Sequence, residues 1–251
     1  MYLSYIFAPF IITAYLNNPL MRTKTILLFV AIHLLLNGCV TYYPQAVDVP
    51  LIKKKGDIRI DAGAFLIPNI NGTTDDSEPL TDCGIHATVT AGISNMLAVQ
   101  TYVSVDVLSR LHFQTALGLY KRFENNTVTE LYGGVGYGNG YMSALAGSAK
   151  DNYYLTFSQF NIGKTDLGKN HIDCGLGLKG GYLFTNTADN TSQTIYKKDG
   201  WMIEPTAFLR FGGNRAKFST KVNYLWTNSI MDAYYFPVSV SFGVNFHAGK
   251  K

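Results

Sequence analysis

A short stretch near the start of the chain carries the residue types needed for covalent lipid attachment. Residues 36–39 read Leu-Asn-Gly-Cys, and an apolar run at 26–36 leads to them from Arg22 and Lys24. A positive segment, an apolar run too short to span a bilayer, and a small residue before a cysteine are typical of a lipoprotein signal. The thiol of Cys39 is therefore the predicted lipid-attachment site.

This signal divides the chain into three predicted parts. Residues 1–38 form a leader and lipoprotein signal peptide whose predicted start is Met21. Residues 39–55 contain two prolines and form an extended, lipidated tether. Residues 56–251 form the folded body. The alternative for the leader is a helical hairpin or an uncleaved anchor.

Histidine and serine could carry hydrolytic chemistry. Outer-membrane acyl hydrolases need a serine beside a histidine that is oriented by an acid. Outside the leader the histidines are His86, His112, His171 and His247. They fall on different segments with no serine-bearing motif beside them, so we predict no catalysis and keep a membrane-embedded hydrolase as an alternative.

Charged residues recur at the polar positions of strand-like segments. Both signs are present, so these side chains either pair across a narrow interior or line a small-solute pore or ligand cleft. Neither a metal nor a cofactor is predicted, because no ligand spacing or phosphate-loop pattern is present. The candidate lumen-lining residues are Asp106, Glu130, Asp173, Lys179, Glu204, Arg210 and Lys221.

The elements that would position these residues are β-strands. Apolar and polar residues alternate with period two along 84–94 and again along 97–106, as in a hairpin. The same pattern recurs often enough to predict about ten strands of a length that crosses an outer membrane. The other segments are 56–67, 113–122, 128–138, 153–163, 172–184, 201–211, 218–226 and 236–246.

Short and long connections alternate between these strands. Short turns are predicted at 94–95, 124–126, 164–170 and 212–215, and long polar connections at 68–83, 139–152 and 186–198. Outer-membrane barrels show this asymmetry. A soluble sandwich or lipocalin-like barrel would alternate too, with its apolar face inward. Aromatic content of 14% and the loop pattern favour the membrane barrel, and about ten strands predict an interior largely filled by side chains.

Three segments depart from simple alternation. Pro205 cannot donate a hydrogen bond, so it predicts a bulge or a weaker strand. Along 153–163, Leu155 and Phe157 are out of phase with Phe160 and Ile162, which a bulge could repair. The glycines of 133–140 predict a close-packed or strongly curved strand.

Composition narrows the partners and the compartment. The formal charge of +4 falls to +2 once a leader with Arg22 and Lys24 is removed, which leaves no footprint for nucleic acid. With Cys39 lipidated, Cys83 and Cys174 remain, near opposite ends of the predicted barrel. We expect two free, mostly buried thiols.

The head of the mature chain resembles a group of uncharacterised outer-membrane β-barrel lipoproteins of the Bacteroidetes type. The resemblance continues in short motifs at 130–137, 160–163 and 204–208 and implies a lipidated barrel without an assigned activity. The head residues that carry it are Cys39, Tyr43-Pro44, Pro50-Leu51 and Lys55-Gly56-Asp57.

The predicted protein is all-β: an antiparallel transmembrane barrel of about ten strands, lipid-anchored in the outer membrane, behind a signal peptide and tether. A structural, surface or envelope-assembly role is expected, with a narrow channel for small polar solutes as the alternative. The expected partners are outer-membrane lipid and, for an assembly role, envelope proteins. The sequence does not indicate the oligomeric state.

Overall fold

The structure is a computed structural model that describes residues 47–67, 82–106, 111–144, 147–189, 195–196, 199–228 and 238–249. The predicted signal peptide, Cys39 and most of the predicted long connections lie outside these ranges. Within them, no helix is long and apolar enough to cross a membrane.

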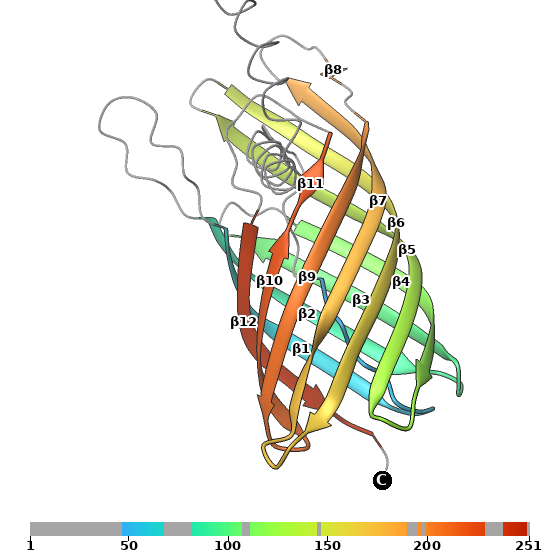
Figure 1. Cartoon of the computed structure of the whole chain (residues 1–251). Helices are drawn as coiled ribbons and strands as arrows, with labels where there is room; N and C mark the ends of the chain where they lie inside the picture. The colour runs from blue at the N-terminus through green and yellow to red at the C-terminus, as the bar shows by residue number, and fades with distance from the viewer. Residues whose placement is uncertain are drawn as a thin grey trace, which may run out of the picture. The chain divides into compact units, whose positions relative to one another are not determined.

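Ten antiparallel strands close into one barrel (Figure 1). Each strand pairs with its neighbours along the sheet, and the circle is completed between β7 and β9. The predicted fold class and strand number are confirmed. The barrel strands are β1 (Ile58–Ile67), β2 (Asp82–Gly92), β3 (Leu97–Asp106), β4 (Leu111–Arg122), β5 (Thr127–Ala144), β6 (Gly147–Leu167), β7 (Ile172–Asp189), β9 (Gly200–Gly212), β10 (Ala216–Tyr224) and β12 (Val238–His247).

Two further strands extend the sheet. β8 (Ile195–Tyr196) pairs with β7, and β11 (Trp226–Thr227) pairs with β9. The four short connections at 93–96, 123–126, 168–171 and 213–215 gather at one end of the barrel, where β1 begins and β12 ends. We call this the turn end and the opposite end the loop end.

The outward face of the barrel is apolar and the inward face is polar. Outward side chains remain exposed although they are large and hydrophobic, whereas charged and amide side chains at the alternating positions are buried. This arrangement is that of β-barrels that span membranes. The exposed set includes Ile85, Val89, Leu117, Leu131, Val135, Leu176, Leu178, Leu209, Val222 and Phe242.

The predicted long connection at 139–152 is wrong. β5 and β6 continue past Asn139 and Asn152 as a paired hairpin until Ala144 meets Gly147. With 18, 21 and 18 residues, β5, β6 and β7 exceed the length needed to cross a bilayer. The backbone there satisfies its hydrogen bonds by pairing, so this side of the barrel projects beyond the others at the loop end.

The predicted bulge in 153–163 is also absent. β5 and β6 pair without a register shift across this stretch, and inward and outward positions alternate strictly. Leu155 and Phe157 point into the lumen with Tyr153, while Phe160 lies on the outer face. The broken pattern reflects an apolar patch inside the barrel and not a change of phase.

Pro205 lies in β9 without a bulge, opposite Leu178 of β7. On its other side, the β10 ladder stops at Asn223, and β11 resumes at Trp226 in the same register. The gap in the neighbouring strand thus lies opposite Pro205, which has no N–H to donate to a partner there. Cys83 and Cys174 are both free, but they are half-buried and not buried as expected.

A charge on the outer face should discriminate a membrane barrel from a soluble one. Leu178→Arg, at mid-height of β7, should lower the free energy of unfolding in lipid vesicles by about 2–4 kcal/mol. Phe218→Arg, near the turn-end rim, should cost about 0–1 kcal/mol. Equal effects from urea titrations of the two variants would contradict a bilayer around the barrel.

Candidate functional site

A segment before β1 lies inside the barrel. We call residues 47–53 the strap; they have no regular secondary structure, and Val49, Leu51 and Ile52 are fully buried. The Asp48 carbonyl oxygen accepts a hydrogen bond from Gln159 Nε2 at 2.8 Å. An extended segment was predicted here, but its position within the lumen was not.

Side chains of the barrel wall bind the backbone of the strap and hold one of its residues in a strained conformation. The Ile52 N–H donates to Glu130 Oε1 at 2.8 Å, and the Val49 carbonyl oxygen accepts from Arg210 Nη1 at 2.8 Å. Leu51 has φ of 56°, a left-handed conformation that costs a bulky residue about 1–2 kcal/mol. Such a conformation persists only where surrounding contacts hold it.

Glycines in the barrel wall make room for the strap. A Cβ at Gly92 would lie 2.9 Å from Ile52 Cγ2, one at Gly163 would lie 3.0 Å from Leu51 Cδ2, and one at Gly177 would lie 2.9 Å from Val49 Cγ2. The contacts at Gly92 and Gly177 are closer than side chains tolerate, and the one at Gly163 is tighter than most side-chain contacts. The wall is therefore shaped to the strap on three strands, β2, β6 and β7.

A buried ion cluster ties the strap to β1, β9 and β10. We call Asp48, Asp61, Arg210 and Lys221 the strap cluster. Asp48 Oδ1 lies 2.9 Å from Arg210 Nη2 and 3.1 Å from Lys221 Nζ. Lys221 Nζ also donates to Asp61 Oδ1 at 2.6 Å, and Arg210 Nη2 lies 3.7 Å from Asp61 Oδ2. Two carboxylates thus balance two cations in a space closed to solvent, which buried charges require.

A second group of ion pairs holds the turn end of the lumen. Lys217 Nζ lies 2.6 Å from Asp173 Oδ1 and 3.1 Å from Asp166 Oδ1. Lys53, the last residue of the strap, also pairs with Asp166. Arg59 Nη1 lies 4.0 Å from Asp173 Oδ2. The strap is therefore held by charge at both ends.

Asp57 lies between the strap and β1, and its side chain is fully buried. Its Oδ2 accepts a hydrogen bond from the Lys53 N–H at 2.9 Å, and its Oδ1 lies 3.4 Å from His247 Nε2. Burial raises the pKa of Asp57, but the interactions with His247, the Lys53 amide and Arg59 outweigh it and leave the pKa below its ordinary value. The carboxylate is thus held in its charged form.

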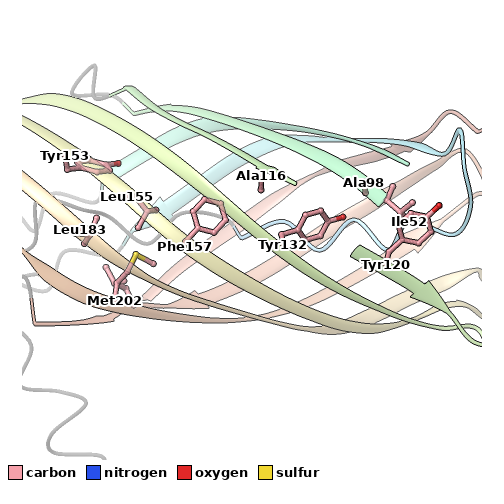
Figure 2. Packing of buried hydrophobic residues seen from close by; sticks show 11 residues of the cluster. Ile52, Ala98, Ala116, Tyr120, Tyr132, Tyr153, Leu155, Phe157, Leu183 and Met202 are labelled. Carbon is pink, nitrogen blue, oxygen red and sulfur yellow. The ribbon is translucent and has the colours of Figure 1, made fainter. Parts of the chain in front are cut away.

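The side of the lumen formed by β6, β7 and β9 carries an apolar patch toward the loop end, whereas Ser104 and His112 are buried on β3 and β4. Figure 2 shows Tyr153, Leu155 and Phe157 of β6 beside Leu183 of β7 and Met202 of β9, all buried. A Cβ at Gly134 would lie 2.7 Å from Phe157 Cζ, and one at Gly138 would lie 2.1 Å from Tyr153 Cζ. The prediction of a close-packed strand at 133–140 is therefore confirmed at these two glycines.

Six of the seven candidate lumen residues are buried inside the barrel. Beyond the contacts above, Lys179 Nζ lies 3.3 Å from Glu204 Oε2 and over the Phe157 ring. Asp106 is half-buried at the loop end of β3 and does not join the strap cluster. The six are Glu130, Asp173, Lys179, Glu204, Arg210 and Lys221.

Sequence reasoning missed several members of these clusters. Arg59 and Asp61 alternate with Ile58 and Ile60 in the first strand, so period two was enough to place them inward. Asp48 gave no such signal, because it lies outside any strand.

The histidines have neighbours that the sequence did not indicate. His86 Nε2 lies 3.3 Å from Asp61 Oδ1, and His86 is in register with Ser104 of β3. A serine thus lies opposite His86 on the neighbouring strand, although no serine-bearing motif stands beside a histidine in the sequence. Both side chains of the His86–Asp61 pair are only 1% exposed, so the pair stays inaccessible to a substrate in bulk solvent. His171 and His247 lie at the turn end.

Within the described ranges, no three His, Cys, Asp or Glu side chains converge as a metal site requires. The arrangement is instead a set of mutually neutralising ion pairs around an internal chain segment. These ion pairs hold the strap against the barrel wall.

Comparisons with known proteins yield structural likenesses only. No protein-family model matches the chain, and no curated protein does. The attachment invasion locus protein Ail of Yersinia pestis has 10% identity and a TM-score of 0.36 over 77% of this chain and 99% of its own. The outer membrane protein OprG from Pseudomonas aeruginosa has 12% identity and a TM-score of 0.37 over 78% of this chain and 98% of its own. Likenesses this distant transfer no function.

Removing one carboxylate from the strap cluster should be costly. Asp61→Asn leaves Lys221 and Arg210 buried with Asp48 as the remaining close carboxylate of the cluster. Breaking a buried pair in this way should lower the free energy of unfolding by about 3–5 kcal/mol. Glu124→Gln, in the exposed 123–126 turn, is the matched control and should change it by about 0.5 kcal/mol or less. A loss for Asp61→Asn no larger than the control, in urea titration, would contradict the cluster's role.

Proposed function

We propose that the protein is a lipid-anchored outer-membrane β-barrel that its own strap closes, and that it serves a structural, surface or envelope-assembly role without catalysis. The observation that carries this proposal is the strap itself. It occupies the lumen between β2, β6 and β7, and side chains of the wall bind its backbone.

A closed lumen fits a barrel of this size. Ten strands enclose a space that side chains can largely fill, whereas water-filled porins use many more strands. Here the strap and its ion pairs fill the turn-end half, and the apolar side chains of Figure 2 line the lumen toward the loop end. Such a barrel offers its surfaces, and not a pore, for function.

The lipid anchor remains a proposal, because Cys39 lies outside the described residues. Eight residue steps separate Cys39 from Val47 in the lumen. An extended chain of that length reaches at most about 29 Å. That span is comparable to the thickness of the hydrocarbon core of a bilayer. A lipid on Cys39 therefore stays close to the membrane around the same barrel.

A narrow polar path is the second candidate. Polar atoms of four neighbouring strands, β1, β2, β10 and β12, are buried without a hydrogen-bond partner among the described residues. Groups of this kind bond to water inside proteins. They make one side of the lumen suited to hydration beside the strap. The atoms are Arg59 Nε and Nη2, His86 Nδ1, Thr88 Oγ1, Thr90 Oγ1, Ser219 Oγ, Ser241 Oγ and His247 Nε2, and further atoms of this kind lie on β5, β7 and β9.

Planar-bilayer conductance separates the two candidates. The unaltered protein should give no resolved current steps, whereas Ile52→Asp should give them. The new carboxylate would replace an apolar side chain that packs with Ala98 and Tyr120, and an unpaired charge buried there should drive the strap out of the lumen. Lys54→Gln, exposed on the same segment, is the control and should stay silent.

Heat-modifiable migration on a gel shows which variants are folded. Current steps from the unaltered protein, unchanged in folded Ile52→Asp, would overturn closure by the strap and favour the channel.

Lipid attachment has a direct test. Mass spectrometry of the N-terminal peptide from the protein expressed in a Gram-negative host should show Cys39 at the mature N-terminus with a lipid mass added. Cys39→Ser should abolish that mass, whereas Cys83→Ser should retain it. An unmodified Cys39 in the mature protein would rule out the anchor.

A further inference from the structure

We propose that the turn end of the barrel carries a binding site for an anionic phospholipid, with the headgroup at Lys169 and Asn170 and an acyl chain in a groove between β7 and β9. This inference rests on the proposed insertion of the barrel in a membrane. It adds a site on the outer wall, away from the strap.

The first observation is the charge of the turn end. Every Lys and Arg side chain whose burial is described and that is exposed lies there, on the short turns, the adjoining strand ends and the segment before β1. We call these residues the basic collar: Lys54, Lys55, Lys121, Arg122, Lys164, Lys169 and Arg215.

Acidic side chains do not neutralise the basic collar. Glu124 is the one exposed carboxylate among the described residues of the turn end. Asp166 is half-buried and already pairs with Lys53 and Lys217. A ring of uncompensated cations at a membrane edge attracts anionic headgroups, and the field falls off within a Debye length.

The second observation is a groove on the outer wall beneath this charge. It has a volume of about 550 Å³ and is lined by Ile172, Leu209, Phe211 and Gly212, with Lys169 and Asn170 at its turn-end edge. β7 and β9 pair directly there, with Cys174 opposite Leu209. Gly212, whose φ of 144° other residues rarely adopt, completes the lining at the turn end of β9.

The lining matches the two parts of a phospholipid. Leu209 and Phe211 are exposed apolar side chains on the face that meets hydrocarbon, which suits an acyl chain. Lys169 offers an ammonium and Asn170 an amide N–H₂ at the level where the strands end, which suits a phosphate. A soluble phosphate would use only the second part, and a zwitterionic lipid would gain little from the basic collar.

Native mass spectrometry of the full chain in nanodiscs can count bound lipid. Nanodiscs of phosphatidylcholine with a minor fraction of phosphatidylglycerol should release the barrel with phosphatidylglycerol retained. Lys169→Gln should weaken this retention about fivefold, and Lys169→Arg should preserve it. Lys121→Gln removes one charge from the basic collar on β4, away from the groove, and should leave retention nearly unchanged.

Every other outcome argues against the site. Equal losses for Lys169→Gln and Lys121→Gln would mean diffuse attraction without a site. Displacement of phosphatidylglycerol by millimolar glycerol phosphate would mean a soluble phosphate ligand. Equal retention of phosphatidylcholine would remove the role of charge. Failure of the barrel to enter nanodiscs at all would instead overturn the proposed function on which the site rests.

Discussion

Closure of the sheet between β7 and β9 is the constraint on which the rest of the structure depends. In hydrocarbon, no backbone N–H or C=O can be left unpaired, so a membrane sheet has to be circular. Once the circle is closed, every strand residue faces either lipid or the lumen. Within the span of the membrane, charged side chains can then lie only inside, and each needs a partner there.

The strap cluster neutralises the cations that closure of the sheet buries in the lumen. Arg210 and Lys221 come from β9 and β10, where inward positions leave them no access to solvent. Asp61 of β1 supplies one opposing charge, and Asp48 of the strap supplies the other. The strap therefore supplies a carboxylate that balances the cations of the wall, and the wall holds Leu51 of the strap in its left-handed conformation.

Much of the barrel could be predicted from the alternation of apolar and polar residues, because each strand residue of a closed sheet faces either lipid or the lumen. The strand number and the inward position of Glu130 and Lys221 follow from it. Alternation failed where the lumen is apolar, at Leu155 and Phe157, since it assumes a polar interior. It also could not show that β5 and β6 pair beyond Asn139, or where a segment outside the strands would lie. Asp48 and the strap belong to this last class, because their position depends on hollows at glycines from three separate strands.

Because the strap connects directly to β1, the number of residues along it decides which parts of the barrel wall it meets. Pairing of β1 with β2 and β12 fixes the height of Arg59 and Asp61 in the wall. Residues 54–57 form the turn between the strap and β1, in which the Asp57 N–H donates to the Lys54 carbonyl oxygen at 3.2 Å, so the length of the strap itself determines how deep Asp48 reaches. One residue inserted into the strap between Val49 and this turn would shift an extended chain by about 3.4 Å, which is enough to move Asp48 away from Arg210 and Val49 away from Gly177. The strap thus works as a measured spacer, whose length sets which residues of the wall it meets.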